Sequence, residues 1–297
     1  MEELSPKIPA AILSVIATFG MFGNFNIIVA TVRTSSLRTT CNYLIAFTAL
    51  FDFIHQLSQY VVTYFAFVGD YPTIEKCFCF QFLPMIGCNA AEVAMLFTSL
   101  DRLYCVARPV AYQHVSCALE IPICVAVSLF FGLWINYESY MSFQSIRFQT
   151  TVCTLGSCYN EALEAVTISN GLIHLATIFI YGIIFIVIKK ITKQKASGML
   201  RSIAAVTFCV VGGWLLTMVL FEVFLSSGIP VSDALILYLG IPLNISISLN
   251  YPIYFLMSSR YRVVFKEQLN LLRCRNFFGT TVQEVSNTSS GGVALKS

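Results

Sequence analysis

Long apolar runs alternate with short polar segments along most of the chain. At a rise of about 1.5 Å per residue, a helix of about 20 residues crosses the roughly 30 Å hydrocarbon core of a bilayer. The pattern therefore predicts seven transmembrane helices, and the fourth is the shortest because Asn136 and Glu138 end its apolar run. The predicted spans are residues 8–32, 41–68, 78–100, 121–137, 165–188, 202–225 and 234–257.

The residues after the last apolar run follow a different pattern. Between residues 261 and 273, apolar side chains recur on one helical face, which predicts a short amphipathic eighth helix on the membrane surface. Residues 274–297 are rich in Ser and Thr and predict a disordered cytoplasmic tail. Cys274 is a candidate for lipidation, with a plain thiol as the alternative. The apolar face consists of Tyr261, Phe265, Leu269 and Leu272.

The composition agrees with a membrane protein. Of the 297 residues, 57% are hydrophobic and 11% are charged, which is more apolar surface than a soluble domain of this length can bury. The sequence thus predicts an all-α membrane protein, a seven-transmembrane helix bundle with a short eighth helix. The net charge of +3 is too small to indicate a nucleic-acid partner.

The positions of Lys and Arg predict the orientation. All basic residues except Lys7, Lys76 and Arg147 fall on the side of the membrane opposite to the N-terminus. Because basic loops are retained in the cytoplasm, we expect a multi-pass plasma-membrane protein with its N-terminus outside and its C-terminus in the cytoplasm.

This orientation places four cysteines on the outer side. Disulfides persist outside the cell, so one or two bridges are expected there. Four cysteines allow three connectivities, and free buried thiols are the alternative. The four are Cys77, Cys79, Cys153 and Cys158.

Several polar side chains fall inside the predicted spans, where their cost invites a functional interpretation. Asn24, Asp52, His55 and Glu92 form a candidate buried polar or ion site. Buried carboxylates would also suit a secondary transporter, but the two halves of the chain lack matching broken helices. The sequence contains no HExxH, nucleophile elbow or Gly-rich phosphate loop, so we expect neither an enzyme nor a bound metal.

Several motifs together resemble a rhodopsin-like G-protein-coupled receptor. They are Gly23-Asn24, Asp52 in the second span, DRLYCVARPVAY at residues 101–112 and NYPIY at residues 250–254. The stretch SLRTTCNYLIAFTALFDFIHQ at residues 36–56, together with the DRL variant, is most similar to the nematode serpentine chemoreceptors of class X, the srsx-type group.

The resemblance implies a chemosensory receptor that switches conformation when a small molecule binds from outside and then activates a heterotrimeric G-protein. Asp101 would restrain Arg102, which would contact the G-protein α-subunit once freed. Arrestin is a further implied partner, and no cofactor is expected beyond a sodium ion near Asp52. The implied switch residues are Asp101, Arg102, Tyr112, Asn250 and Tyr254.

The resemblance also implies one disulfide and a ligand pocket. Cys77 would bridge to Cys153, with Cys158 as the alternate partner. Helix arithmetic then gives six candidate pocket residues between the third, fifth, sixth and seventh spans. They are Gln81, Met85, Asn89, His174, Glu222 and Tyr238.

The chain departs from the receptor pattern in its prolines. Pro252 stands one position away from its usual place in the NYPIY motif, which predicts a shifted kink. The fifth and sixth spans lack their usual prolines, so the usual switch around Trp214 is not expected to carry over unchanged.

Overall fold

The computed structural model describes residues 5–112, 114, 117–189, 198–227 and 232–272. The predicted tail, including Cys274, lies outside these residues. Within them the regular secondary structure is helical, and the extended segments meet only in an isolated antiparallel bridge between Thr73 and Thr150. The α-helices are α1 (Lys7–Arg33), α2 (Thr40–Gln56), α3 (Ser58–Val68), α4 (Ile74–Ala107), α5 (Pro109–Tyr112), α6 (Cys117–Ser142), α7 (Leu155–Tyr159), α8 (Leu163–Val187), α9 (Gly198–Ser226), α10 (Asp233–Leu239), α11 (Ile241–Ser248), α12 (Asn250–Met257) and α13 (Ser259–Leu272), with short 3-10 helices at Ser35–Leu37, Gln144–Ile146 and Asn160–Ala162.

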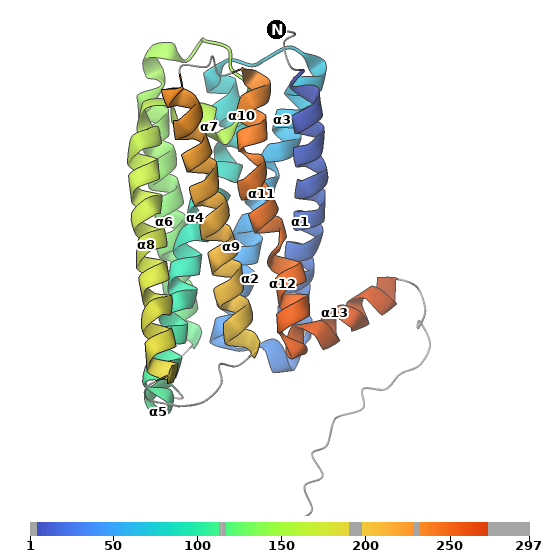
Figure 1. The fold of residues 1–297 in the computed structure, drawn as a ribbon, viewed down its shortest axis with the longest axis vertical. Coiled ribbons are helices and arrows are strands. Elements are labelled where there is room, and N and C mark those ends of the chain that lie inside the picture. The colour runs from blue at the N-terminus through green and yellow to red at the C-terminus, as the bar shows by residue number, and fades with distance from the viewer. Residues whose placement is uncertain (1–4, 113, 115–116, 190–197, 228–231, 273–297) are drawn as a thin grey trace, which may run out of the picture.

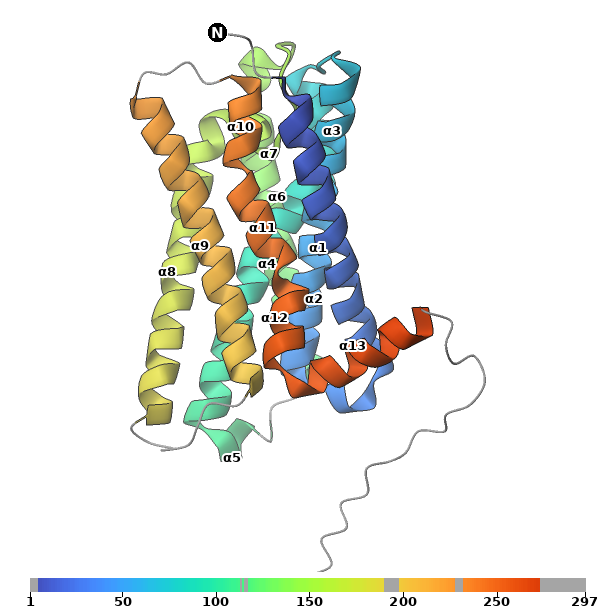
Figure 2. The ribbon, with the colours of Figure 1, turned by 45° about the vertical axis from the view of Figure 1, so that its right-hand side comes forward.

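The long helices run side by side as an upright bundle, with the N-terminus at one end and α5 and α13 at the other (Figure 1; Figure 2). In the described part of the chain, six helical stretches are long and apolar enough to cross a membrane. Large apolar side chains point out of the bundle, such as Phe130 on α6, which is 72% exposed, and Phe179 on α8, which is 70% exposed. The protein is therefore a multi-pass membrane protein whose outer surface suits lipid. The six stretches are α1, α4, residues 118–142 of α6, α8, residues 200–224 of α9, and residues 233–257, which comprise α10, α11 and α12.

The second predicted span is divided. It forms α2 and α3, which meet at Leu57, where the amides of Leu57 and Tyr60 each bond a carbonyl three residues earlier. Thr39 caps the start of α2 by accepting from the amide of Asn42. Gly69 ends α3 with φ 77°, a left-handed conformation that glycine adopts without strain. Neither half alone has the length of a membrane span, although the two follow one another directly.

The last predicted span is divided twice, at Gly240 and Leu249. Pro242 occupies the first turn of α11, and Pro252 lies in the first turn of α12. A proline has no amide proton and its ring clashes with the carbonyl four residues earlier, so each interrupts the preceding helix. The displaced proline of the NYPIY motif thus accompanies a break just before Asn250.

The fourth predicted span is longer than its apolar run, because α6 continues to Ser142. The polar side chains at which the predicted span ended, Asn136 and Glu138, have hydrogen-bond partners within the bundle. Asn136 donates from Nδ2 to the carbonyl of Phe82 on α4 at 2.9 Å, and Trp134 donates to Glu138 at 3.2 Å. A polar residue whose hydrogen bonds are made within the bundle need not end a span.

Helix α4 is the central element, since it packs against α2, α6 and α8. Gly87 permits the closest approach, because a Cβ there would lie 2.7 Å from both the amide nitrogen of His55 and the carbonyl oxygen of Phe51. Beyond α12, α13 turns away from the bundle axis (Figure 1). Its buried residues Tyr261 and Phe265 pack against the end of the bundle.

Candidate functional site

An ion pair and a tyrosine meet at the α5 end of α4. The carboxylate of Asp101 accepts hydrogen bonds from Nε of Arg102, at 2.7 Å, and from its Nη2. Tyr112 donates its hydroxyl proton to Oδ1 of Asp101 at 2.7 Å and accepts from Nη2 of Arg102 at 2.8 Å. Each residue thus contacts the other two, and we call Asp101, Arg102 and Tyr112 the latch.

The latch is largely shielded from solvent. The side chain of Asp101 is 0% exposed and that of Arg102 is 13% exposed. A buried ion pair is tolerated only when both charges keep good partners, and here each charge has two. Burial and the hydrogen bond to Asp101 raise the pKa of the Tyr112 hydroxyl well above its ordinary value. The hydroxyl therefore keeps its proton and remains a donor.

The residues beside the latch connect it to three other helices. Leu103 and Val106 of α4 pack against a hydrophobic cluster that includes Tyr181 of α8 and Tyr254 of α12. Thr207 of α9 donates to the hydroxyl of Tyr181 at 3.5 Å. A shift of α8, α9 or α12 would therefore change the packing around Arg102.

A cavity of about 230 Å³ lies inside the bundle. Helices α1 to α4 and α7 to α12 all contribute to its lining, which is mostly apolar, with residues such as Val62, Met95 and Leu237. Asp52 and Glu92 are the carboxylates among the described lining residues, and none of these is Lys or Arg. The cavity thus suits an apolar molecule and offers an anion no cationic side chain among its described lining residues.

Two of the four residues of the predicted polar site, Asn24 and Asp52, belong to one hydrogen-bond network beside this cavity. Asn250 donates from Nδ2 to Asp52 at 2.7 Å and to Asn24 at 3.2 Å. Asn24 donates to Gln56 at 3.3 Å, and Gln56 donates to Ser248 at 2.9 Å. Gln56 and Ser248 were not among the four residues of the predicted polar site, and Ser248, a polar residue within an apolar run, carries a weak signal in the sequence. The network joins α1, α2, α11 and α12.

Glu92 belongs to a second polar group. Its Oε2 lies 3.2 Å from Nδ1 of His174 on α8, and the His174 ring centroid lies 4.7 Å from that of Trp214 on α9. Among the described residues, neither Asp52 nor Glu92 forms a hydrogen bond or ion pair with His55, which lines the same cavity. The predicted polar site is therefore divided within one continuous cavity.

Several polar atoms around this cavity lack a hydrogen-bond partner among the described residues. They include Oε2 of Glu92 and both ring nitrogens of His174, whose approach to one another is close but not aligned as a hydrogen bond. The lining residues Asn170, Thr217 and Asn244 each have one such oxygen. An unpaired buried polar atom costs about 1–3 kcal/mol of folding free energy. A bound molecule that forms hydrogen bonds with these atoms would offset that cost.

The predicted pocket residues do not themselves line the cavity. Asn89 and His174 lie just behind it: Asn89 accepts a hydrogen bond from Asn170, and His174 contacts Glu92. Glu222, which was predicted to line a ligand pocket, is exposed on α9. Sequence spacing gives the depth of a residue but not the rotation of its helix, and α4 turns Cys88, Ala91, Glu92 and Met95 toward the cavity instead. The six residues absent from the lining are Gln81, Met85, Asn89, His174, Glu222 and Tyr238.

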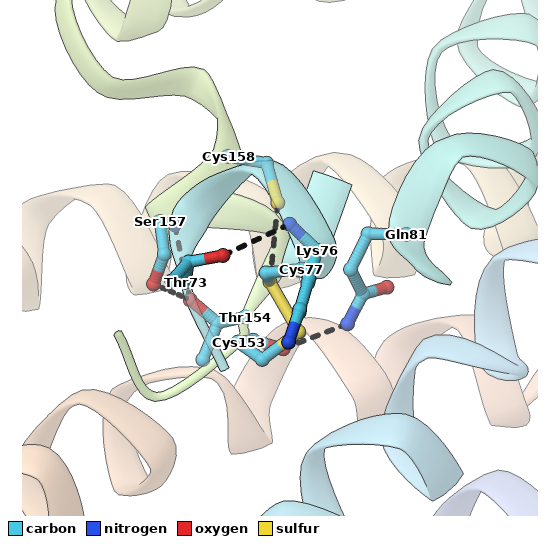
Figure 3. The surroundings of a disulfide bond; sticks show 8 residues. All are labelled: Thr73, Lys76, Cys77, Gln81, Cys153, Thr154, Ser157 and Cys158. Atoms are coloured by element: carbon cyan, nitrogen blue, oxygen red, sulfur yellow. Dashed lines mark hydrogen bonds between the residues drawn. A yellow bond between two sulfur atoms is a disulfide. The ribbon is translucent and has the colours of Figure 1, made fainter. Parts of the chain in front are cut away.

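The loop before α8 covers the end of the cavity near the N-terminus. A disulfide joins Cys77 on α4 to Cys153 in this loop, which is the pair that the resemblance implies (Figure 3). Gln81 donates to the carbonyl of Cys153 at 2.7 Å. Directly after Cys153, the residues Thr154, Leu155 and Gly156 line the cavity, as does Tyr159. We call residues 153–159 the roof segment.

Comparison with known proteins places this geometry in a family. The model of the family described as serpentine type 7TM GPCR chemoreceptor Srsx matches residues 17–269. The matched region includes the latch, the cavity lining from α2 onward, the disulfide and nearly all of α13. The match therefore covers the site as well as the fold.

Proposed function

Because the chain belongs to the serpentine type 7TM GPCR chemoreceptor family Srsx, we propose that it detects a small molecule in the bundle cavity and activates a heterotrimeric G-protein through the latch. The observation that carries this proposal is the position of both sites on α4. Glu92 faces the cavity, and Asp101 and Arg102 lie about two and a half turns further along the same helix.

The proposed topology has seven spans. Helices α2 and α3 together form the second span, since neither is long enough to cross the membrane alone. Helix α13 is the eighth helix and lies at the cytoplasmic surface. The N-terminus, the disulfide and the roof segment lie outside, and the latch lies inside. The positions of Lys and Arg along the sequence support this orientation.

The proposed ligand is a small neutral or cationic molecule with an apolar body. The apolar lining supports the apolar body, and the lack of Lys and Arg among the described lining residues argues against an anion. Its polar end would bond the unpaired oxygen of Glu92, behind which His174 lies. Since His174 also contacts Trp214, a ligand there would act on α4, α8 and α9 together.

In the proposed mechanism the ligand favours a state in which the latch is open. Asp101 and Tyr112 release Arg102, which then contacts the G-protein α-subunit, while Asn250 and Tyr254 adjust with α12. A ligand that binds the open state about 5.5 kcal/mol more tightly would move its population from about 1% to 99%. The receptor performs no covalent chemistry on the ligand or the G-protein, and arrestin would compete for the same open surface.

The proposed role of Asp52 is to hold a sodium ion or water together with Asn24 and Asn250. The hydrogen bonds of 2.7 Å and 3.2 Å from Asn250 support a common polar site for these residues. His55, which lines the cavity nearby, would influence the same switch.

A ligand screen in cells that co-express a promiscuous G-protein tests the main proposal. A molecule that activates the wild-type receptor should fail with Arg102→Ala at equal surface expression, while Arg108→Ala, an exposed residue nearby, should respond normally. A full response from Arg102→Ala would contradict the proposal. The rival reading, a secondary transporter, predicts substrate flux in proteoliposomes that depends on Asp52 or Glu92 and not on Arg102.

A further inference from the structure

We propose that the disulfide between Cys77 and Cys153 exchanges with the free thiol of Cys158, so that the roof segment is attached to α4 at either of two points. This device is additional to the receptor function proposed above. Only its effect on ligand entry depends on that function; the chemical step does not.

The three sulfur atoms already lie together. Sγ of Cys158 is 3.4 Å from Sγ of Cys77, the sulfur that Cys153 holds in the bridge (Figure 3). All three side chains are fully buried at 0% exposure, and Cys158 is a free thiol. Cys79, the other cysteine at this end of α4, is exposed. The contact between Cys77 and Cys158 is thus protected from outside thiols.

The step needs no oxidant or reductant. The thiolate of Cys158 attacks Sγ of Cys77, a new sulfur–sulfur bond forms, and the bond between Cys77 and Cys153 breaks. Cys153 leaves as a thiolate and takes up the proton that Cys158 has lost. One disulfide and one thiol are present before and after the exchange.

The two attachment points lie on either side of the residues that cover the cavity. Leu155 and Gly156, which line the cavity, stand between Cys153 and Cys158. The far end of the roof segment has its own support, because Asn89 donates to the Tyr159 hydroxyl at 3.0 Å and Ser142 donates to the Tyr159 carbonyl at 3.1 Å.

With the bridge at Cys158, the disulfide and the hydrogen bonds of Tyr159 would both hold the end of the roof segment that is nearer to α8. The near end would keep the hydrogen bond from Gln81 to the Cys153 carbonyl and the backbone bridge between Thr73 and Thr150. The cover over the cavity would loosen, and a molecule from outside would enter more readily.

The rate of exchange should depend strongly on pH. Burial raises the pKa of the Cys158 thiol from its ordinary value to about 12. Because only the thiolate attacks, the rate should rise about tenfold for each pH unit below that value. Exchange is thus slow at neutral pH and is faster whenever the roof segment opens and hydrates Cys158.

Mass spectrometry of the full-length receptor in detergent tests the exchange. The protein is incubated at pH 7 and pH 9, quenched in acid, alkylated and digested with chymotrypsin, since cleavage after Leu155 separates Cys153 from Cys158. We expect both Cys77–Cys153 and Cys77–Cys158 linkages, with the second approaching its equilibrium share about 100-fold faster at pH 9. A single linkage that stays unchanged at both pH values would overturn the proposal. The Cys79→Ser variant should behave like wild type; loss of exchange in it would show that Cys79, and not Cys158, attacks the bridge.

Two further variants test the effect on the roof segment without any ligand. Cys153→Ser allows only the bridge to Cys158, and Cys158→Ser allows only the bridge to Cys153, so each keeps one disulfide. Amide hydrogen exchange at residues 152–157 should be at least severalfold faster in Cys153→Ser. Equal rates would contradict the loosening of the roof segment, whatever the receptor binds.

Discussion

The hydroxyl of Tyr112 lies 2.7 Å from Oδ1 of Asp101, which precedes it by 11 residues across the turn from α4 to α5. This hydrogen bond gives the ion pair between Asp101 and Arg102 a third member, because the same hydroxyl accepts from Arg102 at 2.8 Å. The spacing D-R-x9-Y in the sequence is therefore the spacing that lets α5 fold back onto the end of α4.

Tyr112→Phe should raise the basal activity of the receptor about tenfold or more at unchanged surface expression. The substitution keeps the ring but removes one hydrogen bond to each charge, and a hydrogen bond to a charged group contributes about 1.5–3 kcal/mol. The closed latch is weakened, so the open state becomes more populated. Basal G-protein activation in cells measures the effect.

Tyr104→Phe is the matched control for Tyr112→Phe. Tyr104 is exposed and its ring lies 6.1 Å from that of Tyr112, so its hydroxyl plays no part in the latch. Basal activity should stay at the wild-type level. A fall in basal activity in Tyr112→Phe would mean that Tyr112 supports the open state instead.

Glu92→Gln should lower the potency of a cationic ligand at least tenfold, and that of a neutral ligand by less. The carboxylate lines the cavity and faces His174 at 3.2 Å, and the amide keeps its size while removing its charge. Dose–response curves for ligands found by screening measure the change. Glu222→Gln, at an exposed position of α9, should leave potency unchanged; equal effects of the two substitutions would argue against Glu92 as the polar anchor.

Asp52→Asn should abolish any stabilisation of the purified receptor by sodium. The carboxylate is buried, and Asn250 donates to it at 2.7 Å. An amide cannot supply the charge that a sodium ion requires. Thermal unfolding in sodium and in a bulky organic cation gives the comparison, and Asp70→Asn, which changes an exposed aspartate, should retain the sodium effect. A sodium effect that survives in Asp52→Asn would place the ion elsewhere.

Gly87→Ala should destabilise the fold by about 1–3 kcal/mol, the usual cost of overpacking. The added Cβ would meet the backbone of α2 at 2.7 Å on two sides, and backbone atoms cannot move aside as a flexible side chain can. Gly182→Ala on α8 is the control, because a Cβ there meets nothing within 4 Å. A thermal shift assay should therefore show a lower melting temperature for Gly87→Ala, and an unchanged or slightly higher one for Gly182→Ala. Equal melting temperatures would mean that α2 and α4 adjust without cost.

Much of the fold followed from local sequence. Six of the seven predicted spans overlap helical stretches of membrane length, because the length and apolarity of a span are properties of consecutive residues. Caps such as Thr39 and Thr73, and the glycine at position 69, act on their immediate neighbours in the same way. The three residues of the latch lie within 12 positions of one another, so the motif that contains them can be read from the sequence.

Other features depended on contacts between distant segments. Leu57, which divides the second span, carries no proline or glycine signal, and the polar end of α6 was hidden because Asn136 finds its partner on α4. The residues that line the cavity could not be read from spacing for a related reason. The rotation of each helix is set by packing with its neighbours, and the exposed Glu222 shows that spacing alone does not fix which face of a helix lies inward.

The sequence by itself determined that this chain spans a membrane, belongs with the receptors that carry its motifs, and has an Asp-Arg pair at a helix end, because hydropathy and motif spacing are local and additive. Only the tertiary structure decided that Glu92 faces His174, that Asp52 shares one cavity with Glu92, and that Cys158 approaches the bridged sulfur of Cys77. These pairings join residues about 40 to 80 positions apart, and their geometry comes from how whole helices and the roof segment pack.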